Sequence, residues 1–311
     1  MRTCVVVNPR SQGGQTERRW GALADVIRQH YGPFEARFTR GPGDGAAQAR
    51  AALEEGFELV VAMGGDGTIS EVADGFVDRD GKPLREGALL GVLPAGTGGD
   101  FRRTIGMPKT LPEAAAALRG HKSARIDLGR LEFTDHDGQP AVRHFINIAS
   151  FGIGGVVDEL VNQGSKLLGG RLSFMLATLQ AQARFQNQRV RMRLDDGPRV
   201  ERVIHNVAVA NGRFFGGGMM IAPEAKLDDG RFDVVELGDF SRLELLTGGM
   251  KVYRGTHLGL PKVTLARAQL VEAEPGQASE RVLLDVDGEQ PGRLPARFRL
   301  LPGVLRLKLP E

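Results

Sequence analysis

A chain of 311 residues, of which 41% are hydrophobic and 25% charged, is long enough to form two hydrophobic cores, so two domains are the default expectation. Its 41 basic and 38 acidic residues leave a formal net charge of +3, well short of the basic excess of a nucleic-acid-binding protein, so no nucleic-acid partner is expected. Cys4 is the only cysteine, which excludes an internal disulfide and a metal site built from several cysteines.

The first 122 residues alternate between short apolar stretches and helical patterns. Strands are predicted at residues 3–7, 35–39, 60–63 and 88–93. Helices of about ten residues or more are predicted between them, and a last helix opens with the capping-box spacing of Thr110 and Glu113. This alternation predicts an α/β domain with a doubly wound, Rossmann-like parallel sheet that is covered by helices on both faces.

Polar, glycine-containing loops follow the predicted strands of this domain. They comprise residues 8–14, 39–45, 64–68 and 96–100. Because the carboxyl ends of parallel strands meet at one edge of a sheet, and ligands bind beyond that edge, we expect these loops to form a ligand site.

The third strand runs directly into Gly64-Gly65-Asp66-Gly67, and a helical pattern starts immediately afterwards. Glycines let the backbone approach a bulky anion, and the free N–H groups of a helix start favour negative charge, so the expected ligand is a phosphate. Asp66 would repel this phosphate unless a cation, or a hydroxyl whose proton it accepts, lies between them. The alternative is an ordinary strand-to-helix turn in which Asp66 caps the helix.

The pattern changes after about residue 122, which predicts domains at residues 1–122 and 123–311, with the final strand as a candidate to return to the first domain. Only two helical patterns occur here, at residues 166–185 and 241–253, and the second opens with a capping box of Ser241 and Glu244. Strands are predicted at residues 125–133, 142–149, 189–194, 203–210, 231–237, 262–271, 281–287 and 297–301. This order predicts an antiparallel β-sandwich domain.

Five motifs in sequence order resemble those of the diacylglycerol kinase catalytic family, in the form of the bacterial soluble lipid kinases. They are Val7-Asn8-Pro9, the Gly-Gly-Asp-Gly-Thr turn at residues 64–68, the segment at residues 93–101, the segment at residues 222–230, and Val286-Asp287-Gly288-Glu289. The resemblance covers nearly the whole chain. It implies transfer of the γ-phosphoryl group of ATP to a lipid hydroxyl in the presence of Mg²⁺, with diacylglycerol as the leading acceptor and phosphatidic acid as its product.

The resemblance also implies roles for individual residues. The implied nucleotide contacts are Asn8, Pro9, Arg10, Ser11, Gln12, Thr39, Gly64, Gly65, Asp66, Gly67, Thr68, Ile69, Ser70 and Thr97. The implied structural metal site consists of Asp229 and backbone oxygens of Lys226 and Arg231. Asp287 and Glu289 form the implied catalytic pair, one of them accepting the proton of the attacking hydroxyl, while Asp66 supports the metal through water. The sequence does not decide between Asp287 and Glu289, and an Asp-Gly pair taken by itself favours a hairpin turn.

The chain departs from the family pattern in its loops. Gly99 precedes Asp100 where family members commonly carry Asn, Ser70 replaces a usual Asn, and Gln12 stands where the first loop usually has Gly. These changes leave open a nucleotide other than ATP and a non-catalytic protein that binds lipid or nucleotide. Because acyl-chain recognition rests on pocket shape, which no short motif encodes, a kinase for another lipid alcohol, such as a sphingoid base, ceramide or monoacylglycerol, also stays open. An NAD kinase is a more distant alternative.

The expected partner is a lipid alcohol at a membrane surface, and a homodimer stays open. No segment approaches the roughly 20 apolar residues of a membrane span, so we expect a cytoplasmic protein that is peripherally associated with a membrane. The apolar segment at residues 166–176 includes Lys166 and Arg171. It is interpreted as a helix of the core or, alternatively, as an element that contacts the membrane or acyl chains.

Overall fold

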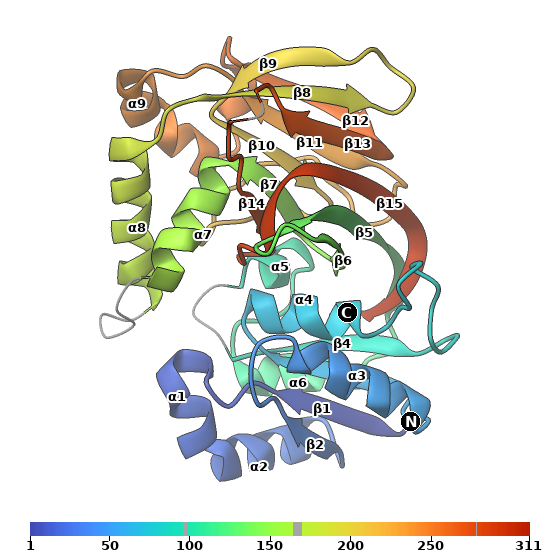
Figure 1. Ribbon diagram of the computed structural model, residues 1–311. Helices are drawn as coiled ribbons and strands as arrows, with labels where there is room; N and C mark the ends of the chain where they lie inside the picture. Colours follow the sequence, from blue (N-terminus) through green and yellow to red (C-terminus); the bar gives the residue numbers. More distant parts are fainter. Residues whose placement is uncertain (96–98, 164–169, 278) are drawn as a thin grey trace. The chain divides into compact units, whose positions relative to one another are not determined.

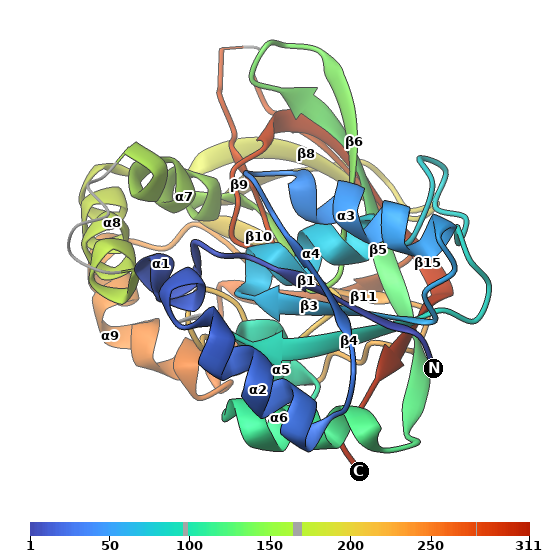
Figure 2. The same cartoon turned by 90° about the horizontal axis from the view of Figure 1, so that it is seen from below.

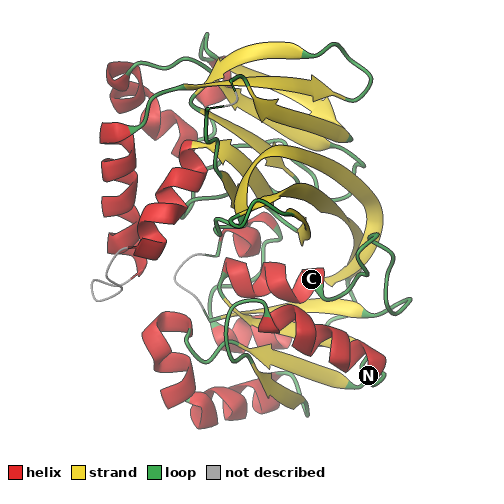
Figure 3. Ribbon diagram, in the orientation of Figure 1, coloured by secondary structure: helices red, strands yellow, loops and turns green. Residues whose placement is uncertain are grey.

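A computed structural model describes residues 1–95, 99–163, 170–277 and 279–311 (Figures 1 and 3). The chain divides into two compact units. Unit 1 comprises Met1–Leu128 and Pro302–Glu311, and unit 2 comprises Gly129–Leu301. Two strands run from one unit into the other, β5 (Ser123–Asp135) and β15 (Gly292–Lys308). The domain division expected at residues 122–123 falls at the start of β5.

Unit 1 contains a parallel sheet in the strand order β2-β1-β3-β4-β15. Its strands are β1 (Thr3–Val7), β2 (Glu35–Phe38), β3 (Leu59–Gly64), β4 (Leu89–Pro94) and the last part of β15. Every residue of β1 and β3 is buried, as expected for strands that are covered on both faces. The predicted doubly wound sheet is confirmed, and the end of the chain adds a strand to it, with Arg306 and Leu307 paired to β4.

Helices cover both faces of this sheet, with α3 and α4 on one face and α2 and α6 on the other (Figure 2). The helices of unit 1 are α1 (Ser11–Arg18), α2 (Trp20–His30), α3 (Asp44–Glu54), α4 (Asp66–Asp74), α5 (Asp100–Thr104) and α6 (Leu111–Arg119). The capping box predicted at the start of α6 is wrong. The hydroxyl of Thr110 donates to the carboxylate of Glu113 (2.6 Å), and the Thr110 side chain makes no capping hydrogen bond.

Unit 2 is a sandwich of two mainly antiparallel sheets. One sheet contains the first part of β15, β13 (Leu270–Pro275), β8 (Gln188–Leu194) and β9 (Val200–Ile204), with β5 and β6 (Pro140–Phe145) beside β15. The other has the order β12 (Val263–Ala268), β11 (Phe232–Leu237), β10 (Asn206–Ala210), β7 (Ile148–Gly152), β14 (Leu284–Val286). Side chains of both sheets meet in one core, in which the rings of Phe145 and Phe232 stack 5.6 Å apart. The predicted β-sandwich is confirmed.

Three strands that the sequence predicts as continuous are each divided in two. Residues 142–149 form β6 and β7, residues 203–210 form β9 and β10, and residues 262–271 form β12 and β13. In every case the first half belongs to one sheet and the second half to the other. The chain changes sheets at these corners without leaving extended conformation for more than one or two residues, so no turn residues mark the break.

The helices of unit 2 are α7 (Ile153–Gln163), α8 (Gly170–Arg184) and α9 (Arg242–Tyr253), with the 3-10 turn η2 (His257–Gly259) after α9. The sequence analysis missed α7, whose first turn contains Gly154 and Gly155 and therefore has low helix propensity. The capping box of α9 is confirmed, because Glu244 N–H donates to Ser241 Oγ (3.4 Å) and Ser241 N–H donates to Glu244 Oε2 (2.8 Å). Among the helices in the described ranges, none is both long and apolar enough to cross a membrane.

Candidate functional site

The turn between β3 and α4 is locked to the loop that follows β1. Asn8 N–H donates to the carbonyl oxygen of Met63 (3.0 Å), and the Asn8 amide donates to Thr68 Oγ1 (3.0 Å). Thr68 folds back over Gly64 so closely that a Cβ atom at residue 64 would lie 2.3 Å from its hydroxyl. Only glycine fits at this position. The two loops predicted to bind phosphate are therefore neighbours that hold one another in place.

Asp66 is the first residue of α4, and its carboxylate accepts hydrogen bonds from a different helix. The donors are the backbone N–H groups of Gly99 (2.8 Å), Asp100 (3.2 Å) and Phe101 (3.0 Å) at the start of α5. The alternative role as a cap of α4 is wrong, because the N-cap of that helix is Gly65. The negative charge of Asp66 is thus matched by backbone N–H groups, which the sequence analysis did not consider.

The first N–H groups of α4 have no partner within the helix, as at the start of any helix, so this turn offers donors to an anion. The predicted contacts Ile69 and Ser70 are different, since their exposed fractions are only 2% and 0%. The Ile69 N–H donates to the carbonyl oxygen of Gly65 (3.1 Å). Of the residues predicted in this turn, Gly64 to Thr68 lie at the helix start, whereas the side chains of Ile69 and Ser70 are part of the core.

The loop after β1 has an unusual backbone. Gln12, Gly13 and Gly14 have φ angles of 54°, 68° and 85°, in the left-handed region that is uncommon for a residue such as Gln. The carbonyl and side-chain oxygens of Asn8 accept from Ser11 Oγ (2.9 Å) and Arg10 N–H (3.0 Å). The side chain of Arg10 is exposed. The loop is therefore held at its base by Asn8 and leaves a cation at its surface.

The loop after β2 is anchored by Thr39, which the sequence predicts as a nucleotide contact, and by Glu71, which the sequence analysis missed. Thr39 N–H donates to the carbonyl oxygen of Val7 (2.9 Å), which places Thr39 beside the end of β1. Further along, the carboxylate of Glu71 on α4 accepts from Gly43 N–H (2.7 Å) and Gly45 N–H (2.9 Å). An acid in the middle of a helix gives no sequence signal for such a role. Thr97, another predicted nucleotide contact, lies outside the described residues.

Gly99, one of the departures from the family pattern, has a φ angle of 95°. Glycine adopts this backbone without strain, and Asn is the residue that most often replaces it in left-handed conformations. The exchange of Asn for Gly is therefore compatible with the same loop conformation, in which the N–H group of residue 99 reaches Asp66.

In unit 2, Asp287 and Gly288 form a two-residue hairpin turn between β14 and β15. Their φ angles of 52° and 85° are both positive, as in a type I′ turn, so the hairpin interpretation of this motif is confirmed. Asp287 is only 6% exposed. Its carboxylate accepts from three successive N–H groups, those of Ile146 (3.0 Å), Asn147 (3.1 Å) and Ile148 (2.9 Å). Asp287 thereby ties the turn to the corner between β6 and β7.

Glu289 has a more open environment than Asp287. Its side chain is 37% exposed, and its carboxylate pairs with Arg143 of β6 (2.7 Å). A carboxylate offers about four acceptor positions, of which Asp287 has already used three for backbone N–H groups. The two acids of the predicted catalytic pair therefore differ, because Glu289 is partly exposed and pairs with a side chain, whereas Asp287 is buried and accepts from the backbone.

A buried pair of carboxyl groups, Asp158 and Asp285, lies next to this turn. No sequence motif indicated this pair. Asp285 of β14 accepts from Gly288 N–H (2.9 Å) and Ser150 Oγ (3.2 Å). Asp158 of α7 shares a hydrogen bond with Asp285. Burial raises the pKa of Asp285 to about 6, and burial together with repulsion from Asp285 raises the pKa of Asp158 well above its ordinary value. The raised pKa values mean that this pair keeps a proton to higher pH than two exposed carboxyl groups would.

The predicted metal loop is an exposed turn beside a buried acid. Asp229 Oδ1 accepts from Arg231 N–H (3.1 Å), while Asp233 of β11 pairs through Oδ1 with Arg267 (3.0 Å). Asp233 Oδ2 is buried without a hydrogen-bond partner, and burial, with smaller contributions from the charges of Asp229 and Glu224, raises the pKa of Asp233. In the described ranges no three His, Cys, Asp or Glu side chains form a ready metal cluster. The exposed carboxylate of Asp229 and backbone oxygens of Lys226 and Arg231 are nevertheless the kinds of ligand that an oxygen-coordinated divalent cation takes.

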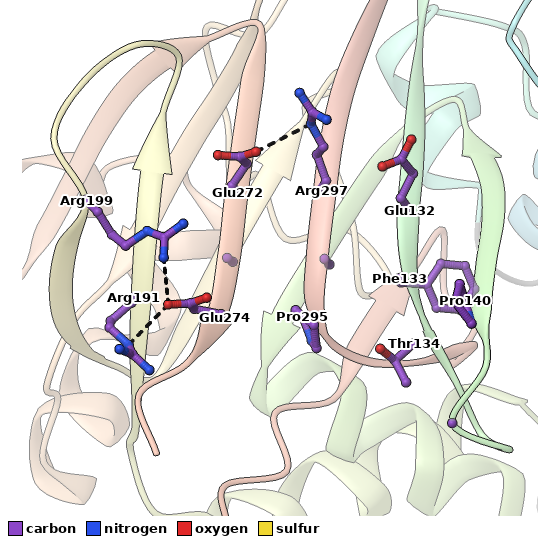
Figure 4. A pocket seen from close by; sticks show the side chains of 13 residues that line it. Glu132, Phe133, Thr134, Pro140, Arg191, Arg199, Glu272, Glu274, Pro295 and Arg297 are labelled. Atoms are coloured by element: carbon purple, nitrogen blue, oxygen red, sulfur yellow. Dashed lines mark hydrogen bonds and ion pairs between the residues drawn. The ribbon is translucent and has the colours of Figure 1, made fainter. Parts of the chain in front are cut away.

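A hollow of about 380 Å³ lies on the β8, β13 and β15 face of unit 2 (Figure 4). Its charged side chains neutralise one another, since Glu274 pairs with Arg191 (3.3 Å) and Arg199 (3.0 Å), and Glu272 pairs with Arg297 (3.5 Å). None of the residues predicted for the site lines it. The hollow therefore offers no excess charge for a phosphate.

Comparisons with known proteins agree over both units. Residues 2–131 match the family model described as diacylglycerol kinase catalytic domain, and residues 147–309 match that described as YegS C-terminal NAD kinase beta sandwich-like domain. A Staphylococcus carnosus protein named diacylglycerol kinase is 28% identical over 100% of this chain and 95% of its own. A Stenotrophomonas maltophilia protein named "Probable lipid kinase YegS-like" is 33% identical over 89% of this chain and 87% of its own. The crystal structure of a Bacillus anthracis diacylglycerol kinase matches 99% of this chain and 96% of its own with a TM-score of 0.68 at 19% identity, which shows a common fold.

Proposed function

The chain belongs to the diacylglycerol kinase-like family of lipid kinases, and from this premise we propose that it transfers the γ-phosphoryl group of ATP to the hydroxyl group of a lipid alcohol. The expected acceptor is diacylglycerol, and the expected product is phosphatidic acid. The observation that carries this proposal is the turn between β3 and α4. There a glycine that no other residue can replace, a helix start and the Asn8–Thr68 hydrogen bond together present backbone donors to an anion.

Phosphoryl transfer requires mainly that the reacting groups be positioned and that the charge on the phosphate oxygens be neutralised. In unit 1, the N–H groups at the start of α4 and the exposed Arg10 supply positive charge for a triphosphate. Asp66 keeps the residue 99–101 segment against this turn through its three hydrogen bonds. In this proposal Asp66 organises the nucleotide loops, in addition to the water-mediated support of a metal implied by the family.

The acceptor hydroxyl needs a proton acceptor, for which we assign Glu289 rather than Asp287. Asp287 is buried and engaged by three N–H groups, whereas Glu289 is partly exposed and pairs with the side chain of Arg143. Asp287 then positions the turn that carries Glu289, and Asp285 holds Gly288 in the same turn. Asp285, Asp287 and Glu289 all belong to unit 2.

Mg²⁺ would serve in two ways. When bound with ATP it neutralises charge on the phosphate oxygens. A second, structural ion would be held by Asp229 together with backbone oxygens of Lys226 and Arg231, where it would offset the buried negative charge of Asp233.

The test is a transfer assay with purified protein, labelled ATP and a panel of lipid alcohols in mixed micelles, with and without Mg²⁺. We expect Mg²⁺-dependent labelling of diacylglycerol, and Glu289→Gln to lower kcat by roughly 100- to 10,000-fold, the usual contribution of a general base, without changing Tm. Asp287→Asn should instead lower Tm, because an amide would turn N–H groups toward the donors at residues 146–148.

The outcomes separate the alternatives. Labelling of another lipid alcohol in place of diacylglycerol would correct the acceptor. ATP binding without transfer to any lipid would refute the kinase assignment and favour a binding protein. Full activity of Glu289→Gln, together with a folded but inactive Asp287→Asn, would make Asp287 the proton acceptor.

A further inference from the structure

The helix α9 in unit 2 carries large apolar side chains on its solvent face. Leu243, Met250 and Tyr253 are 70%, 60% and 47% exposed. They are separated by seven and three residues, a spacing that puts side chains on the same side of an α-helix. A soluble protein gains nothing from exposing such a stripe to water, so the stripe calls for a functional explanation.

The opposite side of α9 fixes the helix to the sandwich. Val252 packs against the apolar cluster that includes Ile148, Ala208 and Val235. Glu244, the only acid of the helix, accepts from Lys262 (2.8 Å) and takes part in the capping box with Ser241. The helix is therefore apolar on two sides, and only one of them is used to hold it in the fold.

Cations flank the exposed stripe. Arg242, Lys251 and Arg254 are all exposed, and none of them forms an ion pair with the residues that the structure describes. Because Glu244 is bound to Lys262, the solvent side of the helix presents positive charge without an acid of its own. An apolar stripe bordered by Lys and Arg is the pattern of a helix that lies in a membrane interface, with its apolar residues among the acyl chains and its cations at the phosphate level.

We propose that this face of α9, defined by Leu243, Met250 and Tyr253 with Arg242, Lys251 and Arg254, docks on the anionic surface of a lipid bilayer. The inference rests on the proposed function, because a lipid acceptor resides in such a bilayer. A second copy of the chain is a poorer occupant, since a symmetric contact would bring three cations against three cations. The neighbouring helix α8 also exposes Leu176 (40%) and Leu179 (59%), and Figure 1 shows both helices on the same side of unit 2.

The proposal is tested by sedimentation of the full chain with vesicles of phosphatidylcholine, with and without phosphatidylglycerol. We expect binding only to the anionic vesicles. Each cation near such a surface contributes roughly a fivefold gain in affinity, so the triple variant Arg242→Gln, Lys251→Gln, Arg254→Gln should bind about 100-fold more weakly. Leu243→Glu with Met250→Glu should reduce binding by at least about tenfold, because it removes the apolar insertion and adds repulsion.

Matched controls lie in unit 1. Leu84→Glu changes a side chain that is 37% exposed, and Arg85→Gln, Arg119→Gln, Lys122→Gln removes three exposed cations. Both should leave vesicle binding unchanged. Equal losses from the control and α9 triples would reduce the effect to net charge and overturn the proposal. So would a dimer of the wild type that Leu243→Glu turns into a monomer with vesicle binding intact.

Vesicle binding and phosphoryl transfer are measured independently, so each proposal can be refuted without the other. Transfer to a lipid alcohol in detergent micelles does not require a bilayer, so the α9 variants should keep that activity. If the wild type binds vesicles through α9 but transfers phosphate to no lipid, the proposed function is refuted and the docking surface is supported. If the protein transfers phosphate in micelles but the α9 variants bind vesicles as well as the wild type does, the docking surface is refuted and the proposed function is supported.

Discussion

Individual carboxylates in this protein hold distant backbone segments together. Asp66 accepts three N–H groups of another helix start, Asp287 accepts three of a strand corner, and Glu71 accepts two of the loop after β2. Hydrogen bonds to a charged acceptor are stronger than those to a neutral one, so each carboxylate fixes the segment that it holds. A motif acid in this chain therefore has a positioning role that must be separated from any chemical role.

The Asp158–Asp285 pair makes stability depend on pH in an unusual direction. Both pKa values are raised in the folded protein, that of Asp285 from 3.8 to about 6, so the folded state binds more protons than the unfolded state above about pH 4. The free energy of unfolding consequently falls as pH rises above about 4. Asp158→Asn keeps a donor for Asp285 without a titrating proton. We expect this variant to gain on the order of 2 kcal/mol over the wild type as the pH is raised above about 4.

Denaturant unfolding at a series of pH values measures this difference. Glu159→Gln is the matched control, because Glu159 is the next residue of α7 and pairs on the surface with Arg281 (3.2 Å) instead. The control should follow the wild-type curve. If the Asp158→Asn curve also runs parallel to that of the wild type, the two carboxyl groups do not share a proton.

At the scale of elements, α5 depends on α4 for its N-terminal hydrogen bonds. The Asp66 carboxylate is the acceptor for the first N–H groups of α5, a helix of only five residues that has little stability of its own. We expect Asp66→Ala to leave β3 and α4 folded, to lower the free energy of unfolding by about 1–3 kcal/mol, and to abolish transfer. Amide hydrogen exchange at residues 99–101 should become faster.

Asp66→Asn provides the comparison, because it keeps one carbonyl oxygen for these N–H groups but removes the charge. Slower exchange at residues 99–101 in Asp66→Asn than in Asp66→Ala is expected. Unchanged exchange in Asp66→Ala would show that other contacts hold the segment.

Elements whose sequence pattern is local were predictable, and those set by tertiary contacts were not. The parallel strands of unit 1 have continuous apolar runs, and the glycines at residues 64–67 by themselves predict a tight turn between a strand and a helix. By contrast, the corners that divide β6 from β7 and β9 from β10 lie inside uninterrupted strand-like sequence. For the candidate site, the sequence names the motif residues, whose roles stay predictions. It gives no signal for Glu71, Asp158 and Asp285, because each of them contacts residues of other elements, to which no local spacing connects it.

At the scale of the whole molecule, the two ends of the chain share one unit. The last part of β15 pairs with β4, and its Leu305 and Leu307 are 1% and 0% exposed. Gly303 N–H also donates to the buried Asp127 (2.8 Å), and Lys308 donates to the carbonyl oxygen of Gly120. These residues therefore belong to the core of unit 1 although they follow the whole of unit 2.

Removal of residues 302–311 should unfold unit 1. The deletion exposes β4 and removes two buried leucines, which together cost roughly 5 kcal/mol, a large part of the stability of an ordinary domain. Far-UV circular dichroism and thermal unfolding of the truncated chain are the measurements. Deletion of Pro310 and Glu311 alone is the control and should have little effect, since neither is buried. A cooperatively folded unit 1 in the longer deletion would contradict this expectation.

Synthesis on the ribosome gives this arrangement a temporal consequence. Residues 302–308, which supply the fifth strand of the unit 1 sheet, are translated only after the whole of unit 2, so the edge of β4 stays unpaired while unit 2 can already fold. Unit 1 is thus begun before unit 2 and completed after it, and a nascent chain that stalls before residue 302 exposes β4 as an unpaired edge strand.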